Sequence, residues 1–428
     1  MSKLIKIIFY SGMIFLFPSQ VCFPQNKILD EIAKINYQNN SLQWQKRNRH
    51  LIPSLSEAEA ILKLNQDRDF DSQDIDKDGV VNHLDPSPFD WREIGYQPFG
   101  VLEFLSWRHP WNEYKYREEQ LERVLKLIKE SGAAFIRVDF IWEDIEPQKG
   151  KYIFDKYDKI VSLCAKENLR LLAILDYSAS WAAARWNSPP NNLQDYAEFC
   201  KVVVNRYKDK IKYWEIWNEP DSQIYWIPQD DMATYTKLLE ISYKAIKQVD
   251  PSSKVVLGGV TEAGYYAIKR IYENGGKNYF DIINIHPFVD PLSEQGFQRI
   301  FIIYDKLERL MVQFKDSNKK IWFTEIGCPG VGKNIKSKGW WKGKSPDEKK
   351  QAEFLFKIYT QLIKLPNLEK IFWAFFRDNK DHFKNDIDYF GLIRWDFSKK
   401  KSFYAYKKSF IKWLNSQENY RNKKRKED

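Results

Sequence analysis

Two glutamates follow apolar stretches and could act as a catalytic pair. The stretch 213–220 is rich in aromatic and branched residues and ends in Asn-Glu-Pro, so it delivers Glu219 where proline stops a strand. The stretch 321–327 has the same form and delivers Glu325 close to a glycine. One carboxylic acid that protonates a leaving oxygen, and one carboxylate that attacks a sugar carbon, are the two groups that hydrolysis of a glycosidic bond requires.

The elements that must position these glutamates alternate between strand and helix along the chain. This pattern predicts a (β/α)8 TIM barrel over residues 95–415, and no repeat or low-complexity linker divides it. In such barrels the chemistry takes place at the C-terminal ends of the strands, where both glutamates would lie. Strands are expected near 100–105, 134–140, 170–177, 213–217, 254–259, 280–286, 321–327 and 370–378.

The Trp-Asn-Glu-Pro sequence that ends at 220, together with Thr-Glu-Ile-Gly at 324–327, resembles clan A of the glycoside hydrolases. Residues 212–226 are most similar to family 39 and its bacterial endoglycosidase relatives, and the resemblance extends over about 98–414. It implies a retaining mechanism on β-linked sugars. Glu219 would be the acid/base after the fourth strand, and Glu325 would be the nucleophile after the seventh.

Three further residues gain an expected role from this resemblance. Arg137 lies inside an apolar strand, where a charge is costly unless it is paired. The resemblance places it against the nucleophile, and the alternative is an ion pair in the core. His286 ends the sixth strand and is expected to contact the substrate or the nucleophile, the alternative being a structural histidine. Trp373 matches the tryptophan that forms the floor of the clan's reactive-sugar subsite.

Other candidates for binding the substrate come from the residues themselves. Asn218 stands beside Glu219 and could hydrogen-bond a sugar 2-hydroxyl. The chain contains 16 Trp, 24 Tyr and 28 Phe, which can serve either as core or as surfaces on which sugars stack. Three aromatic residues follow strands and are expected to line a cleft: Tyr177, Trp181 and Trp226.

The proposed chemistry sets a requirement on protonation. Glu219 must carry a proton at rest if it is to act as an acid. A nearby ionised Glu325 would raise the pKa of Glu219 by repulsion between like charges. The reaction needs no metal, so no catalytic cofactor is expected.

A separate acidic segment at 74–85 has the spacing of a calcium-binding loop. Its ligand positions are filled by Asp74, Asp76, Asp78, the carbonyl of Val80, and Asp85, with a glycine at the sixth position. Aspartate instead of glutamate at position twelve resembles thrombospondin type 3 and dockerin-like loops. The segment predicts a structural calcium site within an N-terminal leader, 24–94. The alternative is a solvated acidic linker.

The two ends of the chain suggest export and a free tail. Residues 1–23 combine two early lysines with an apolar run that is too short to span a bilayer, which is typical of a signal peptide. The cleavage point is open, and Cys22 raises the alternative of a lipid anchor. The sequence therefore predicts a secreted, periplasmic or cell-surface protein without a stable membrane span. The basic segment 416–428 is expected to be disordered.

Composition narrows the range of partners. The formal charge is +10, but no nucleic-acid-binding motif accompanies it, so nucleic acid is not expected as a partner. An acidic polysaccharide stays open as a partner. Cys164, Cys200 and Cys328 are an odd number beyond the leader. Buried thiols are favoured for them, with a bond between Cys164 and Cys200 as the alternative.

Together these features predict a monomeric, retaining glycoside hydrolase that cleaves an extracellular oligo- or polysaccharide by double displacement. Two alternatives are an inactive exported barrel that only binds carbohydrate, and a transglycosylase. Hydrolysis of any natural glycan excludes the first alternative. Analysis of the products formed with an added acceptor sugar tests the second.

Overall fold

The computed structural model describes residues 6–10, 13–17, 97–107, 116–332, 343–380 and 382–427. Strands β1 (Lys6–Tyr10) and β2 (Met13–Phe17) pair antiparallel in a two-stranded sheet of their own. The predicted calcium loop and most of the leader lie outside the described residues. The fold that positions the two glutamates is formed by residues from 97 onward.

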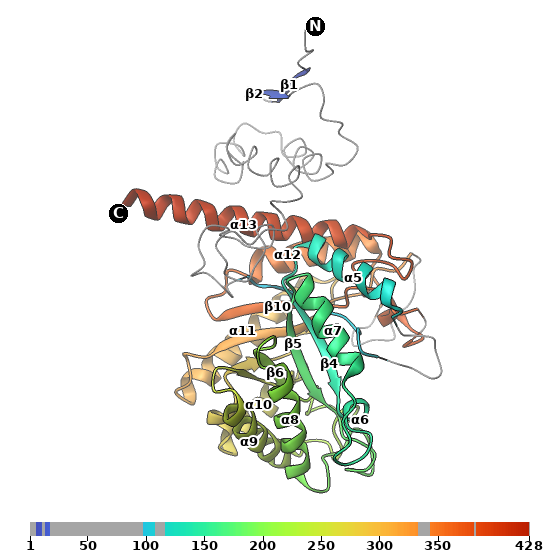
Figure 1. Cartoon of the computed structure of the whole chain (residues 1–428). Coiled ribbons are helices and arrows are strands. Elements are labelled where there is room, and N and C mark those ends of the chain that lie inside the picture. The colour runs from blue at the N-terminus through green and yellow to red at the C-terminus, as the bar shows by residue number, and fades with distance from the viewer. Residues whose placement is uncertain are drawn as a thin grey trace. The chain divides into compact units, whose positions relative to one another are not determined.

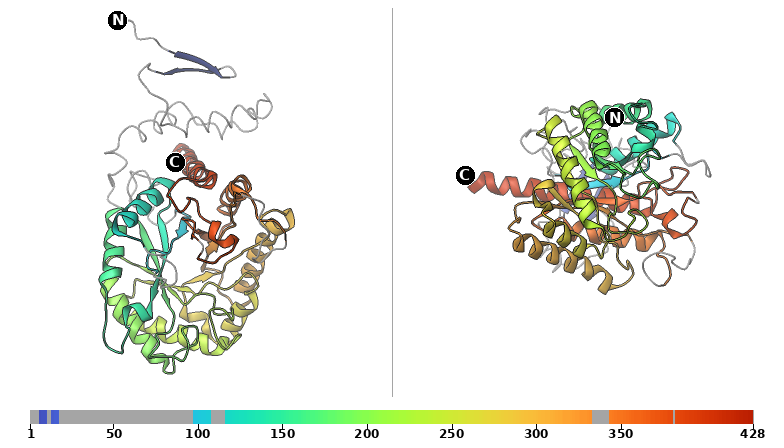
Figure 2. Two further views of the ribbon diagram at one scale, coloured as in Figure 1. Left: turned by 90° about the vertical axis from the view of Figure 1, so that its right-hand side faces the viewer. Right: turned by 90° about the horizontal axis from the view of Figure 1, so that it is seen from below.

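Eight parallel strands close into a barrel in the order β10-β3-β4-β5-β6-β7-β8-β9 (Figures 1 and 2). Each strand except β3 neighbours the one that precedes it in sequence, and β3 closes against β10. The predicted TIM barrel is therefore confirmed, with all eight strands in the expected places. Their bounds are β3 Phe99–Leu102, β4 Phe135–Ile141, β5 Arg170–Asp176, β6 Tyr213–Ile216, β7 Lys254–Leu257, β8 Ile282–Asn284, β9 Lys320–Ile326 and β10 Leu368–Ala374.

Helices surround the barrel, and each turns an apolar face toward the strands. In α5 the buried Leu121, Val124, Leu125 and Ile128 follow a spacing of three and four residues, which places them on one face of the helix. The helices are α5 Glu118–Ser131, α6 Trp142–Ile145, α7 Asp155–Lys166, α8 Leu193–Tyr207, α9 Met232–Val249, α10 Tyr265–Glu273, α11 Glu294–Gln313, α12 Glu348–Leu362 and α13 Lys401–Glu427, with 3-10 turns η4 Gly276–Tyr279 and η5 Asp386–Tyr389.

Side-chain caps mark where four of these helices begin. Asn192, Asp231, Ser293 and Asp347 each accept a hydrogen bond from a backbone N–H of the first turn of α8, α9, α11 and α12. At the C-terminus, α13 lies beside α12 and α5 (Figure 1). It continues to Glu427, so the structure replaces the predicted disordered tail with a helix.

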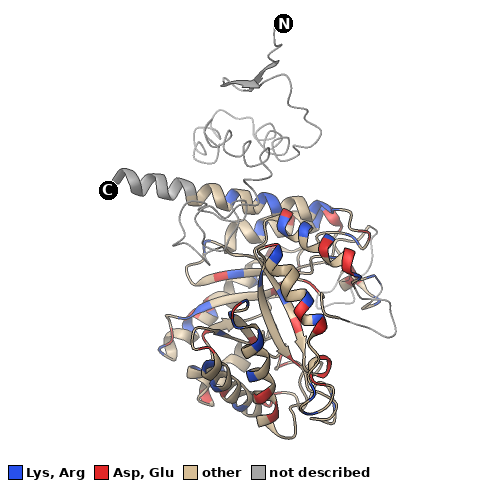
Figure 3. Ribbon diagram, in the orientation of Figure 1, with Lys and Arg blue, Asp and Glu red and all other residues tan. Residues whose placement is uncertain are grey.

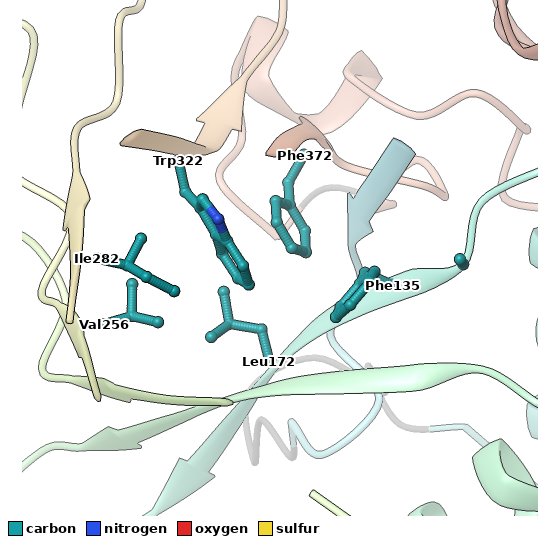
Figure 4. Packing of buried hydrophobic residues seen from close by; sticks show 7 residues of the cluster. Phe135, Leu172, Val256, Ile282, Trp322 and Phe372 are labelled. Carbon is teal, nitrogen blue, oxygen red and sulfur yellow. The ribbon is translucent and has the colours of Figure 1, made fainter. Parts of the chain in front are cut away.

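The barrel interior is aromatic toward the N-terminal ends of several strands. Phe135, Trp322 and Phe372 meet there around Leu172, with ring centroids 5.8 to 6.3 Å apart (Figure 4). Side chains of a strand alternate between its two faces. The residues two positions beyond this layer therefore also point into the barrel, one layer closer to the C-terminal ends. This second layer carries the polar groups of the site.

Positively and negatively charged residues are both distributed over the outer helices (Figure 3). The three cysteines expected to be buried, Cys164, Cys200 and Cys328, are buried and free, so the alternative disulfide between Cys164 and Cys200 is wrong. Among the described residues, none of the helices has the length and apolar character needed to cross a membrane.

Candidate active site

Glu219 and Glu325 converge on one histidine at the C-terminal end of the barrel. His286 Nδ1 lies 3.0 Å from Glu219 Oε1 and 3.9 Å from Glu325 Oε1. These two distances limit the separation of the carboxylate oxygens to at most about 7 Å, which accommodates the ~5 Å separation of retaining enzymes and excludes most of the inverting range. The geometry thus brings together the two glutamates and the histidine singled out from the sequence.

The turn after β6 aims Glu219 by an unusual backbone path. Trp217 and Glu219 have positive φ angles of 68° and 41°, in the left-handed region that residues other than glycine rarely adopt. The N–H of Glu219 donates to the carbonyl of Gly259, 2.9 Å away, just beyond β7. Strained backbone of this kind concentrates where a side chain must be held for function.

Arg137 on β4 forms hydrogen bonds with three other residues of the site. Its guanidinium Nη1 donates to Glu325 Oε1 at 2.5 Å, and Nη2 donates to Asn218 Oδ1 at 2.8 Å. Nε and Nη2 also donate to the two oxygens of Glu215, each at 2.8 Å. Arg137 therefore contacts the residue expected to be the nucleophile, and it also forms the core ion pair considered as the alternative. Because the arginine occupies Oδ1 of Asn218, the amide Nδ2 is left to donate to a substrate.

Sequence reasoning missed three polar residues of the second layer of the barrel. Glu215, Asn284 and Thr324 are fully buried and connected by hydrogen bonds. Glu215 accepts from Arg137, from the Gly259 N–H and from Asn284 Nδ2, the last two at 3.0 Å. Strand alternation could have found them, because each is a polar residue inside an apolar strand and faces inward.

Burial is the main reason why Glu219 holds a proton. Removal from water raises its pKa to about 8, with Asp221 and Glu215 adding repulsion and Arg137 acting in the opposite direction. The repulsion between the two glutamates that the sequence led us to expect is also present: the pKa of Glu325 is raised by burial and by Glu219, and lowered by His286 and Arg137.

The two basic groups of the site differ in charge. Burial opposes the charged form of Arg137, but Glu215 and Glu325 more than offset this and raise its pKa above the ordinary value. Burial, against the opposing effect of Glu325 and Glu215 and with a contribution from Arg137, lowers the pKa of His286 to about 4. Near neutral pH the site therefore holds a cationic arginine and a neutral imidazole.

Two tryptophans predicted to bind substrate belong to the core. Trp373 is fully buried, and its indole N–H donates to the carbonyl of Phe390 at 2.9 Å. It alternates along β10 with Phe372 and Ala374, which belong to interior clusters, so Trp373 points outward from the barrel. Trp226 is also fully buried, edge-on to Trp217 at 5.0 Å. The predictions that these two residues contact sugar are wrong.

An aromatic wall is nevertheless present beside the glutamates. Tyr177 packs edge-on against Trp186, with centroids 4.8 Å apart, and stacks with Tyr225 at 6.1 Å. Trp186 is 51% exposed, and both Glu219 and Glu325 raise the pKa of Tyr225, after the larger effect of burial. Trp181 lies elsewhere: it packs against Trp142 and donates to the carbonyl of Glu146. Tyr177 is thus joined by Tyr225, which is adjacent to Trp226, and by Trp186, which lies in the same loop as Trp181.

No group of three His, Cys, Asp or Glu side chains is placed to hold a metal ion within the part of the chain that the structure describes. The calcium loop predicted at Asp74, Asp76, Asp78, Val80 and Asp85 lies outside that part.

A closed parallel barrel that brings a glutamate after β6 to a glutamate on β9 is the architecture of the clan A glycoside hydrolases, which are retaining enzymes. Comparison with known proteins agrees with this class and makes it more specific. The chain belongs to the cellulase family, glycosyl hydrolase family 5, whose family model matches residues 95–375. The sequence resemblance to clan A is confirmed, and the matching family model is that of family 5, whereas the sequence motifs favoured family 39.

Relatives are distant and differ in their named substrates. The chain is 24% identical to endo-1,4-beta-xylanase B of Thermotoga neapolitana over 255 residues, which covers 55% of this chain and 67% of that protein. It is 26% identical over 144 residues to a 6-phospho-beta-glucosidase of Clostridium longisporum, covering 32% of this chain and 29% of that protein. The chain thus spans less than a third of the second relative.

Solved structures share the fold. A family 39 glycoside hydrolase from Bacteroides cellulosilyticus WH2 has a TM-score of 0.59 and 24% identity, over 74% of this chain and 65% of that chain. GH5_18 from Streptomyces cattleya, solved in complex with GlcNAc, has a TM-score of 0.59 and 14% identity, over 74% and 81%. Members of both families therefore have similar barrels.

Proposed function

We propose that the protein cleaves β-glycosidic bonds of an oligo- or polysaccharide by double displacement, with Glu325 as nucleophile and Glu219 as acid/base. The observation that carries this assignment is the placement of both carboxyls around His286 Nδ1, at 3.0 and 3.9 Å, with Arg137 bound to Glu325 alone of the two. The arginine favours an ionised Glu325, whereas burial and nearby carboxylates favour a protonated Glu219.

In the first step, the Glu325 carboxylate attacks the anomeric carbon while the bond from that carbon to the leaving oxygen breaks. Glu219 gives its proton to the leaving oxygen, so the alcohol departs neutral and a glycosyl ester remains on Glu325. Asn218, held by Arg137 at 2.8 Å, offers its Nδ2 to the sugar 2-hydroxyl. That contact strengthens as positive charge develops on the sugar.

In the second step, Glu219 is a carboxylate and acts as a base. It takes a proton from water as the water oxygen attacks the anomeric carbon and releases Glu325. Both charges return to their starting positions, and the anomeric configuration is retained. This cycle uses no metal or other cofactor.

The aromatic wall supports a saccharide as the leaving group. Tyr177, Trp186 and Tyr225 stand on the β5 and β6 loops, on the same side of the barrel as Glu219, and the exposed face of Trp186 can stack on a sugar ring. We further propose that the protein is exported, on the basis of the N-terminal segment 1–23. As a separate proposal, we expect it to act as a monomer.

The test distinguishes the two glutamates by chemical rescue. Glu325→Gly should abolish hydrolysis, and added azide should then attack the substrate directly and give the α-glycosyl azide. Glu219→Ala should still form the glycosyl-enzyme from a substrate with an activated leaving group, and azide should release the β-glycosyl azide. Glu262→Ala is the matched control, since Glu262 follows β7 at the same end of the barrel but pairs with Arg299, and it should keep wild-type activity.

The opposite stereochemistry in the two azide products would reverse the assignment. Near wild-type hydrolysis of an unactivated glycoside by either variant would refute it. Because the β-linkage is part of the proposal, the wild-type enzyme is first assayed on matched α- and β-aryl glycosides, and activity restricted to the α-series would contradict it.

A further inference from the structure

A buried chain of hydrogen bonds leads away from Glu219 through the barrel to Glu215. His286 lies 3.0 Å from Glu219 through Nδ1 and 3.0 Å from Thr324 Oγ1 through Nε2. The Thr324 hydroxyl is 2.9 Å from Asn284 Oδ1, and Asn284 Nδ2 is 3.0 Å from Glu215. The histidine, threonine, asparagine and Glu215 are all fully buried, so no water competes for these bonds.

The direction of each bond follows from what its atoms can do. A carboxylate only accepts, so Asn284 must turn its Nδ2 toward Glu215 and its Oδ1 toward Thr324. That Oδ1 accepts from the Thr324 backbone N–H at 3.2 Å and from its hydroxyl. A hydroxyl has one proton, and Thr324 has given it to Asn284. Its oxygen can then only accept from His286, which must carry a proton on Nε2.

We infer that Thr324 and Asn284 are positioning residues that hold His286 as the neutral Nε2–H tautomer, so that its Nδ1 accepts the acid proton of Glu219. This inference rests on the proposed role of Glu219 as acid/base. Glu215 sets the direction of these hydrogen bonds, because it accepts from four donor groups: two N–H groups of Arg137, the Gly259 N–H and Asn284 Nδ2.

The charged groups around the pair are consistent with two neutral partners. Asp221, Glu215 and Arg137 act on Glu219, whose pKa burial raises to about 8. Glu325, Glu215 and Arg137 act on His286, whose pKa burial lowers to about 4. Between these values the acid is protonated and the imidazole is neutral, so the single proton between them belongs to Glu219.

The imidazole ring of His286 lies directly against the backbone of Gly259. A Cβ at Gly259 would lie 2.0 Å from His286 Nε2, so the absence of a side chain there lets the ring pack against the backbone. Gly259 also donates to Glu215 and accepts from Glu219, which places both ends of the chain against the same residue.

The tautomer has a consequence for the second half of the reaction. Once Glu219 has given up its proton, its carboxylate faces the lone pair of Nδ1 instead of an N–H donor. A lone pair does not stabilise a carboxylate, so Glu219 is a stronger base in the glycosyl-enzyme than it would be beside the other tautomer. The Nε2–H tautomer therefore keeps Glu219 protonated before the first step and favours recovery of the proton from water in the second.

The test combines a spectroscopic and a kinetic measurement. Long-range 1H–15N correlation spectra of the enzyme with 15N-labelled histidine report which ring nitrogen carries the proton, and the His286→Gln spectrum assigns the signal. Thr324→Val keeps the shape of the side chain but removes the acceptor for Nε2–H. It should convert His286 toward the Nδ1–H form, which donates to the Glu219 carboxylate and lowers its pKa. The alkaline limb of kcat/KM should move down by about one pH unit.

Two further variants separate this effect from loss of packing. Thr324→Ser retains the hydroxyl and should keep both the tautomer and the pH profile. Thr236→Val makes the same substitution at another buried threonine, on α9, whose hydroxyl bonds only a carbonyl of its own helix, and it should change neither.

An Nδ1-protonated His286 in the wild-type enzyme overturns the inference, and this measurement stands even if Thr324→Val does not fold. The inference is also overturned if Thr324→Val folds but leaves the His286 tautomer and the alkaline limb of kcat/KM unchanged. If either of those two results occurs together with azide rescue of Glu219→Ala that has the expected stereochemistry, the inferred role of Thr324 and Asn284 is wrong, while the proposed function holds. If His286 has the predicted tautomer but Glu219→Ala keeps full activity, the arrangement of the hydrogen bonds is right and the proposed role of Glu219 is wrong.

Discussion

Glu215→Gln should destabilise the protein far more than a surface glutamate replaced in the same way. Glu215 is fully buried and accepts four hydrogen bonds, two of them from Arg137 at 2.8 Å. A glutamine has one acceptor oxygen, and its NH2 group must face at least one of these donors. Removing one partner of a buried ion pair typically costs about 3 to 5 kcal/mol. Because Arg137 keeps Glu325 as a second partner, we expect about 3 kcal/mol.

The matched control is Glu240→Gln on α9. Glu240 also accepts from two basic groups, Lys237 at 2.8 Å and Lys244 at 2.5 Å, but its partners are exposed lysines. Exposed pairs contribute about 0 to 1 kcal/mol. Urea unfolding followed by tryptophan fluorescence at pH 7, with the slopes compared, gives both differences. If Glu215→Gln lowers the free energy of unfolding no more than Glu240→Gln does, the hydrogen bonds to Glu215 do not hold the buried network in place.

Three further outcomes are expected. The kcat/KM of the wild-type enzyme should fall above about pH 8, because burial raises the pKa of Glu219 to about 8 and only the protonated form can act as acid; a limb near pH 5 would contradict this. Lys370→Met should raise the free energy of unfolding at pH 7. Burial lowers the pKa of Lys370 to about 8, so its cost is fully present below that pH and disappears as pH rises toward 10.5. Urea titrations should show an increase in the free energy of unfolding of at most about 3 kcal/mol at pH 7, and a smaller increase at pH 10. Calcium should bind through Asp74, Asp76, Asp78 and Asp85, and chelation should lower the melting temperature with activity largely kept; isothermal titration without detectable binding at millimolar calcium would rule out the site.

The sequence allowed the barrel and its catalytic end to be predicted because these depend on local patterns. Apolar runs of strand length, separated by helical periodicity, located all eight strands. Proline after Glu219 and glycine after Glu325 marked strand ends. Arg137 was identifiable because a charge inside an apolar strand must find a partner, and His286 because it stands at a strand end, while the role expected of each came from the resemblance to clan A.

What could not be predicted depends on which face of a strand a residue occupies. Trp373 and Phe372 are adjacent aromatics in one strand, and only the register of the closed barrel decides that Phe372 points inward. Trp226 and Tyr225 are also adjacent aromatics, and Trp226 is buried while Tyr225 packs against Tyr177. They lie in a loop, where neither strand nor helix periodicity predicts which side a residue faces. The main source of the Glu219 pKa shift, burial, was also missed, as were the smaller contributions of Asp221 and Glu215, because all of these depend on the folded geometry around the turn after β6.

Glu215 and Glu219 show how one barrel element can hold two carboxyls in opposite surroundings. They are four residues apart on β6 and the turn that follows it; Glu215 is fully buried, whereas the Glu219 side chain is 15% exposed. Glu215 faces only donors, so its negative charge is matched and serves to orient Arg137 and Asn284. Glu219 faces His286 Nδ1, which accepts when the ring is protonated on Nε2. A carboxyl that meets an acceptor must supply the proton itself, and this is the condition under which a glutamate can act as an acid near neutral pH.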